Sequence, residues 1–220
     1  MRIRKINPSL GFDTSVYPQK ECRDFLKDAG YEFVVRYVNR TFGVKDKPDS
    51  IWPVSLSKQE LDELISEKRI VSIVQFAPHK TMPSFDAGKS AGNAAWRNCK
   101  ELDIPEGVTV WCDLEWEVGD LNPSDVLDYA NAWSSEVSEN GYSVGMYIGP
   151  NIACSGSQLY YDVQLANHYW KSASIVPWVE KRGFQMVQSN QKTVCGGKLI
   201  IDQDIAMYDN KGDRFFVVSK

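Results

Sequence analysis

The sequence predicts a TIM-like α/β barrel, with about five strand–helix units followed by three strands that have few helices between them. As far as residue 150, apolar strand-like runs alternate with helical segments, a pattern typical of parallel strands joined by crossover helices. Three further runs bring the number to eight, and 220 residues lie near the lower size limit of such barrels. A doubly wound open sheet is the alternative, but it needs helices after the later strands too.

The predicted elements have clear boundaries. Strands are expected at residues 10–13, 33–38, 70–76, 108–112, 143–148, 168–175, 184–189 and 199–206. Helices are expected at 18–28, from the cap at Ser57 through at least Ile65, at 84–103, and from Asn122 to the stop at Asn140-Gly141. Ser57 and Glu60 have the spacing of a capping box, and Asn122 precedes a proline at the first helical turn. No repeat or linker divides residues 1–220, which we treat as one domain.

Composition limits the possible partners. The net charge of −4 and the absence of a basic run argue against nucleic acid or an anionic membrane as partner. No apolar run approaches transmembrane length, and residues 1–7 lack the apolar core and cleavage site of a signal peptide. We therefore expect a protein that is made in the cytoplasm. If it acts outside the cell, cell lysis or a dedicated secretion system would release it. We also expect a monomer.

The cysteines and histidines give no sign of a metal centre. The five cysteines are odd in number and widely spaced, which favours reduced thiols when no signal peptide is present. His79 and His168 have no second histidine or cysteine at ligand spacing. We expect no metal and no cofactor, and we expect both histidines to be ordinary polar residues.

Two acids directly follow the fourth predicted strand. Asp113 and Glu115 are alternate residues, so they face the same side, about 6.5–7 Å apart along the chain. Two like charges at the rim of an apolar core raise one pKa, which keeps a carboxyl group protonated near neutral pH. This pair is therefore a candidate general acid with a helper. The alternative is a strand end that runs into an acidic, solvated loop.

Other acids are expected at the same end of the barrel. In such barrels the functional residues lie at the carboxyl ends of the strands. The first predicted strand ends with Asp13, and the eighth carries Asp202 and Asp204. With Asp113 and Glu115 these residues would converge into one acidic bowl.

Three short motifs around these acids resemble those of a known family. They are Gly11-Phe12-Asp13, Asp113-Leu114-Glu115 and Ile201-Asp202-Gln203-Asp204. They resemble motifs of the glycoside hydrolase family 25 lysozymes, and the nearer resemblance is to the uncharacterised glycoside hydrolase-like barrel domains related to them. The Trp-Gln-Tyr of the family's seventh strand is replaced here by Phe184-Gln185-Met186.

The resemblance also implies roles for these acids. Glu115 would be the general acid and Asp113 its assistant. Asp13 and one acid near the carboxyl terminus would shape the site, with Asp202 preferred to Asp204.

The spacing of the pair favours one mechanism. An Asp and a Glu two residues apart on one strand are too constrained to flank a glycosidic bond from opposite faces, as most glycosidases require. They suit substrate assistance, in which the acetamido group of an N-acetyl sugar attacks the anomeric carbon. Asp113 would orient that group while Glu115 protonates the leaving oxygen. We therefore predict a lysozyme-like glycosidase of N-acetylhexosamine polymers, with peptidoglycan the first choice and chitin-like glycans the second.

Four further residues are candidates for contact with the glycan. Tyr147 could donate a hydrogen bond to the acetamido group or to Asp113, or it could be a core residue. Arg36 could pair with an acid of the bowl or form a structural ion pair. Gln185 could hydrogen-bond the substrate, and Trp116 is the best candidate for stacking on a sugar ring.

Two other functions remain open from the sequence. The first is a barrel that binds cell-wall carbohydrate without cleaving it. The second is a metal-dependent hydrolase, in which Asp113, Glu115, Asp202 and Asp204 would hold Mg²⁺ or Ca²⁺ through oxygen ligands.

Overall fold

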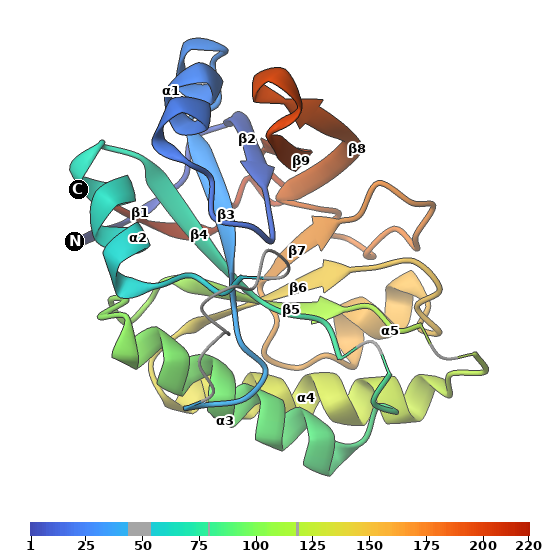
Figure 1. The fold of residues 1–220 in the computed structure, drawn as a ribbon. Coiled ribbons are helices and arrows are strands. Elements are labelled where there is room, and N and C mark those ends of the chain that lie inside the picture. Colours follow the sequence, from blue (N-terminus) through green and yellow to red (C-terminus); the bar gives the residue numbers. More distant parts are fainter. Residues whose placement is uncertain (44–53, 79, 118) are drawn as a thin grey trace.

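Eight strands close into a barrel in the computed structural model, which describes residues 1–43, 54–78, 80–117 and 119–220. Each strand pairs with the next, and the last pairs with the first (Figure 1). In order around the barrel they are β2 (Ser9–Asp13), β3 (Phe33–Val38), β4 (Ile70–Gln75), β5 (Thr109–Leu114), β6 (Ser143–Ile148), β7 (His168–Lys171), β8 (Met186–Val194) and β9 (Leu199–Ala206). The predicted TIM-like barrel is confirmed.

The last barrel strand runs in the opposite direction to the others. The six pairings from β2 to β8 are parallel, whereas β9 is antiparallel to both β8 and β2. The expectation of eight parallel strands is therefore wrong. The four-residue connection 195–198 allows a hairpin but is too short for a parallel crossover. The reversal places the first half of β9, rather than its end, at the rim formed by the carboxyl ends of the other strands.

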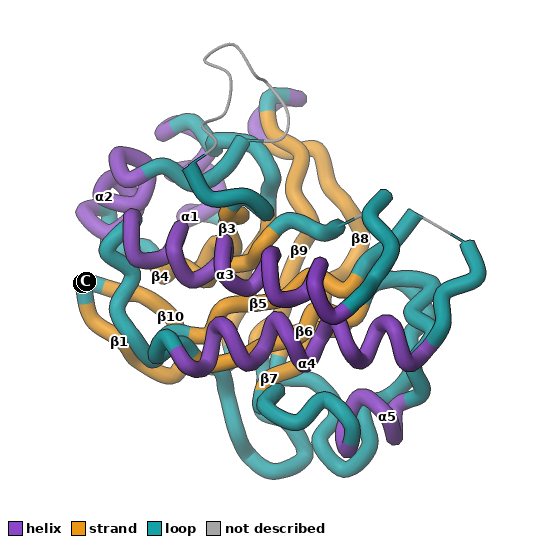
Figure 2. Tube along the Cα trace, turned by 90° about the horizontal axis from the view of Figure 1, so that it is seen from below, coloured by secondary structure: helices purple, strands orange, loops and turns teal. Residues whose placement is uncertain are grey.

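Four helices form where the sequence predicts them. They are α1 (Lys20–Asp28), α2 (Lys58–Ser66), α3 (Phe85–Glu101) and α4 (Pro123–Glu139). Figure 2 shows α3 and α4 side by side across one face of the barrel. A Cβ atom at Gly88 would lie 2.2 Å from the carbonyl oxygen of Tyr129, so this close approach requires glycine. No helix among the described residues has the length and apolar character needed to cross a membrane.

The sequence analysis missed three short elements. One is helix α5 (Gly156–Tyr161); the others are the terminal strands β1 (Arg2–Lys5) and β10 (Phe216–Ser219), which pair with each other. Strand β10 also pairs with β4 at Val71, near the start of that strand. Phe215 and Val217 join the buried cluster inside the barrel together with Trp111. The terminal strands therefore close the amino-terminal end of the barrel and leave the opposite end for a site.

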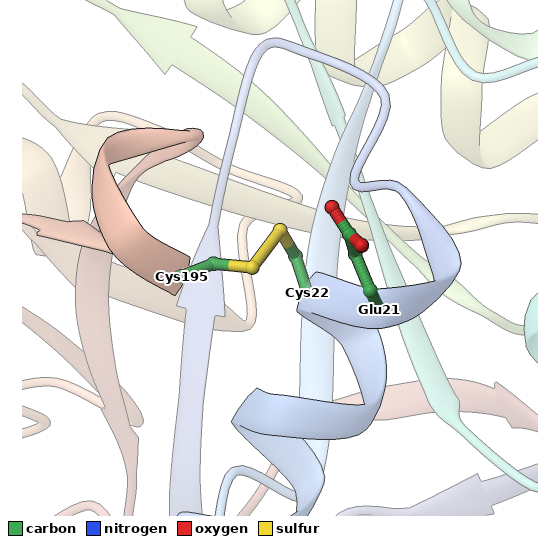
Figure 3. Close-up of side chains that lie close together, drawn as sticks. All are labelled: Glu21, Cys22 and Cys195. Carbon is green, nitrogen blue, oxygen red and sulfur yellow. A yellow bond between two sulfur atoms is a disulfide. The ribbon is translucent and has the colours of Figure 1, made fainter.

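A disulfide joins α1 to the turn between β8 and β9. It links Cys22 to Cys195, 173 residues apart in the sequence, and Glu21 lies next to it (Figure 3). Glu21 also forms an ion pair with Lys198. The expectation of five reduced thiols is therefore wrong for this pair. The sequence gives no sign of the contact, because the β8–β9 hairpin brings its turn to α1 only in the folded barrel. The remaining cysteines are free and buried: Cys99, Cys112 and Cys154.

Candidate active site

Strand β5 carries the acid pair to the inside of the barrel. Its alternate residues Val110, Cys112 and Leu114 belong to the cluster beneath the helices, whereas Trp111 belongs to the cluster inside the barrel. By the same alternation, Asp113 and Glu115 both face the barrel interior at the strand's carboxyl end, and both are partly exposed. The predicted common orientation of the two acids is what the structure shows.

Two adjoining cavities open at this end of the barrel. The first has a volume of about 270 Å³ and the second about 250 Å³. They share Tyr37, Asp113, Glu115 and Asp202 as lining residues. The first cavity is completed by residues of the β6–β8 side: Tyr147, Pro150, Trp170, Ser172, Ala173, Ser174 and Gln188. The second is completed by residues of the β2–β9 side: Asp13, Thr14, Ser15, Phe76, Gln191 and Ile200. Together they have the size of a small-ligand site.

Two buried aspartates with raised pKa values lie beside the cavities. Asp13 accepts hydrogen bonds from the Tyr37 hydroxyl at 2.9 Å and from Gln188 Nε2 at 2.8 Å, and Asp204 accepts one from Trp170 Nε1 at 3.0 Å. Burial, and then the charge of Asp202, raise the pKa of Asp13 to about 7. Burial, and then the charge of Asp13, raise the pKa of Asp204 well above its usual range. We infer that Asp204 is the protonated member of the pair and donates a hydrogen bond to Asp13.

The two acids of β9 have different positions. Asp202 lies opposite Asp13 in the β2–β9 ladder and lines both cavities. Partial burial raises its pKa. Asp204 is fully buried and lines neither cavity. Of the two, only Asp202 can therefore contact a ligand directly.

The pKa of Asp113 is raised well above its usual range. Burial is the main cause, and the charges of Glu115 and Asp13 raise the pKa further, while a hydrogen bond from the backbone of Ala77 lowers it. The Oδ1 atom of Asp113 is buried and has no hydrogen-bond partner. Because Asp113 lines both cavities, a ligand that donates a hydrogen bond would satisfy this oxygen.

Gln188 organises the first cavity, although the sequence analysis did not single it out. Its Oε1 accepts hydrogen bonds from the backbone N–H of Ala173 at 3.3 Å and from the Tyr147 hydroxyl at 3.0 Å, while its Nε2 donates to Asp13. The N–H of Ala173 can only donate, which fixes the orientation of the amide. The single hydroxyl proton of Tyr147 therefore points to Gln188. The expected donation from Tyr147 to an acetamido group or to Asp113 does not fit this network.

Arg36 lies outside the cavities. It is completely buried, and its guanidinium group forms a two-point ion pair with Glu60, at 2.6 and 3.1 Å. It also donates to the carbonyl oxygen of Thr14 at 2.5 Å. The substrate-binding role is thus not supported, and the structural ion pair is the correct alternative. The same contact changes the predicted capping box: Ser57 accepts from the backbone N–H of Glu60, but the Glu60 carboxylate turns to Arg36.

Gln185 and Trp116 also lie away from the cavities. Gln185 is buried and donates to the Asp209 carboxylate at 2.7 Å. Trp116 is 3% exposed, and its indole N–H donates to the carbonyl oxygen of Thr81, so its ring is not available for stacking on a sugar. A strand exposes every second residue on one face, so positions 185 and 188 lie on opposite faces, and Gln188 is the glutamine that reaches the site.

The acids do not form a metal cluster. Among the described residues, the only three-residue group with ligand atoms within 4.8 Å of one another is Glu21, Cys22 and Cys195, and the two sulfurs of that group are bonded to each other (Figure 3). The geometry therefore does not favour the metal-dependent alternative. His168 is buried, which lowers its pKa to about 4, and it has a structural role as expected. His79 lies outside the described residues.

Comparisons with known proteins agree with this fold. The family model of the Rv2525c-like, glycoside hydrolase-like domain matches residues 24–206. An uncharacterised B. stearothermophilus protein has a similar structure, with a TM-score of 0.68, 15% identity and coverage of 90% of this chain and 95% of that one. The Tat-secreted protein Rv2525c of Mycobacterium tuberculosis, in complex with HEPES, has a TM-score of 0.59, 15% identity and coverage of 91% and 96%.

A lytic enzyme shares the same architecture. The Clostridium perfringens spore cortex lytic enzyme SleM has a TM-score of 0.59 and 10% identity, with coverage of 92% of this chain and 69% of that one. No curated protein sequence matches the chain. At these identities the structural similarity establishes the fold alone.

Proposed function

Since this chain belongs to the family of Rv2525c-like glycoside hydrolase-like domains, we propose that it is a glycosidase that cleaves a polymer containing N-acetylhexosamine. Peptidoglycan is the first choice, because the barrel is shared with an enzyme named for lysis of the spore cortex. The observation that carries the proposal is the position of Asp113 and Glu115. Both line the same two cavities, and Asp113 Oδ1 is buried there without a hydrogen-bond partner.

The proposed reaction uses the substrate's own acetamido group. Glu115 donates a proton to the glycosidic oxygen as the bond to the anomeric carbon breaks, and the acetamido oxygen forms a bond to that carbon. Asp113 accepts a hydrogen bond from the acetamido N–H and holds the group in position. The Glu115 carboxylate then takes a proton from water, which attacks the anomeric carbon and restores the acetamido group. Each carboxyl group thus has a separate task, so the two need not flank the bond.

Release of new reducing ends from purified peptidoglycan, analysed by mass spectrometry, tests this proposal. The wild-type chain should release them, and Glu115→Gln should lower the rate by about 10²–10⁴-fold because the general acid is lost. Glu117→Gln is the matched control, since Glu117 is exposed and lines neither cavity. Full activity of Glu115→Gln would contradict the assignment. Binding of peptidoglycan without release by the wild type would instead identify a non-catalytic carbohydrate-binding barrel.

A further inference from the structure

A serine hydroxyl in the first cavity lacks a partner. Ser172 is 2% exposed, lines this cavity, and its Oγ atom forms no hydrogen bond. Its backbone is fully engaged: the N–H donates to the carbonyl oxygen of Ile148 at 3.2 Å, and the carbonyl accepts from Lys171 Nζ at 2.9 Å. A buried polar group without a partner is unfavourable. A hydroxyl kept in this state at a cavity wall is available for a ligand.

The backbone that carries this hydroxyl is held in place by its neighbours. Lys171 Nζ bridges the carbonyl oxygens of Ser172 and Ser174, at 2.9 and 2.7 Å. The next residue, Ala173, donates its N–H to Gln188. The segment after β7 is thus held at three successive residues, and a ligand would not have to order it. Such preorganisation is typical of residues that determine specificity.

Three other neutral donors that line the first cavity already have acceptors. The Tyr147 hydroxyl donates to Gln188, the Tyr37 hydroxyl donates to Asp13, and the Trp170 indole donates to Asp204. Ser174 also lines this cavity but is exposed, so Ser172 has the buried hydroxyl that can still donate to a carbonyl oxygen of a ligand.

We propose that Ser172 recognises the acetamido carbonyl oxygen of the sugar, while Asp113 Oδ1 accepts the N–H of the same group. A secondary amide offers one donor and one acceptor. Two buried side-chain atoms without a partner belong to residues that line the first cavity: the acceptor Asp113 Oδ1 and the hydroxyl Ser172 Oγ. Ser172 would then be a specificity-determining residue that separates N-acetyl sugars from sugars with a hydroxyl at the same carbon. This inference rests on the proposed glycan substrate but not on cleavage.

Binding of two neutral tetrasaccharides tests the inference. One is the β-1,4 tetramer of N-acetylglucosamine, and the other is the β-1,4 tetramer of glucose, which lacks the acetamido group. All proteins carry Glu115→Gln, so no cleavage interferes, and affinities are measured by calorimetry. Ser172→Ala should bind the N-acetylated tetramer about tenfold more weakly, as expected for one lost hydrogen bond, with no change for the glucose tetramer. Ser172→Thr, which keeps the hydroxyl, should retain the preference, and Ser66→Ala, at an exposed serine of α2, is the matched control.

The remaining outcomes separate this inference from the proposed function. Three results would overturn the role of Ser172. Ser172→Ala could weaken the binding of both tetramers equally, or leave the affinity for the N-acetylated tetramer unchanged. The Glu115→Gln protein with native Ser172 could also fail to bind the N-acetylated tetramer. The Ser172-dependent preference in a chain that releases nothing from peptidoglycan would support the inference and contradict the glycosidase. Release of new reducing ends from peptidoglycan, together with a binding preference that does not depend on Ser172, would support the glycosidase and contradict the inference.

Discussion

Asp13 on β2 lies directly opposite Asp202 on β9, because β9 runs antiparallel to its neighbour. In an antiparallel ladder, opposite residues project to the same side, so both carboxyl groups face the second cavity. The charge of Asp202 raises the pKa of Asp13, and the charge of Asp13 in turn raises the pKa of Asp204. One reversed strand thereby concentrates three carboxyl groups at one side of the site.

Stability should fall as the pH rises. The pKa of Asp13 is raised from 3.8 to about 7, so between these values the unfolded chain releases a proton that the folded chain keeps. The free energy of unfolding should therefore decrease from about pH 4 to pH 7 through Asp13. The pKa values of Asp204 and Asp113 are raised by burial in the same direction, so these residues should add to the decrease. Urea denaturation at pH 5 and pH 8 measures the difference. Asp204→Asn, whose amide can still donate to Asp13, should make the difference in stability between the two pH values smaller. Equal stability of the wild type at both pH values would contradict the raised pKa values.

Asp113→Asn should separate stability from activity. The substitution removes a carboxyl group whose ionisation is disfavoured by burial and by neighbouring charges, so the melting temperature should stay the same or rise. The rate of glycan release should fall about 100-fold or more, because an asparagine amide binds the acetamido N–H less well and can turn its own donor toward it. Thermal denaturation and the release assay, run on the same preparations, test this pair of effects. A variant that retains full activity would exclude Asp113 from the reaction.

Tyr147→Phe should have a small effect on activity. The hydroxyl proton of Tyr147 is directed at Gln188 rather than at the cavity, so its loss should lower kcat/KM by less than about tenfold, the equivalent of one neutral hydrogen bond. Gln188→Ala should lower it more, since Asp13, Ala173 and Tyr147 all lose a partner. A loss above 100-fold in Tyr147→Phe would show that the hydroxyl donates to the substrate after all.

The disulfide should stabilise the wall of the second cavity. Ile200 and Asp202 of β9 line that wall, and the hairpin that carries them is joined to α1 through Cys195 and Cys22. Cys22→Ser should lower the free energy of unfolding by about 2–5 kcal/mol, measured by denaturant titration without reductant. A reductant should destabilise the wild type by a similar amount and leave Cys22→Ser unaffected. If the reductant lowered the free energy of unfolding of both proteins equally, its effect would not come from the bond between Cys22 and Cys195.

Local patterns in the sequence predicted the barrel and the acid pair. Strand alternation placed Asp113 and Glu115 on one side, and the helices begin at the predicted caps Ser57 and Asn122. Long-range partners were not predictable in this way. Arg36 is paired with Glu60, from a helix that only the fold brings near, and the disulfide spans most of the chain.

Strand register accounts for the other misplaced residues. A shift by an odd number of residues exchanges the two faces of a strand, so Gln185 was chosen where Gln188 reaches the cavity. Tyr37 was also missed, although Phe33 and Val35 of its strand face the barrel interior and the same alternation places Tyr37 there. The direction of β9 depends on a short connection that composition alone does not reveal.

The bond between Cys22 and Cys195 encloses most of the polypeptide in a covalent ring. A protease that nicks one loop anywhere between these residues would leave two fragments that stay attached to each other. They would migrate separately on a denaturing gel only after reduction. A molecule nicked in this way would keep both halves of its barrel together.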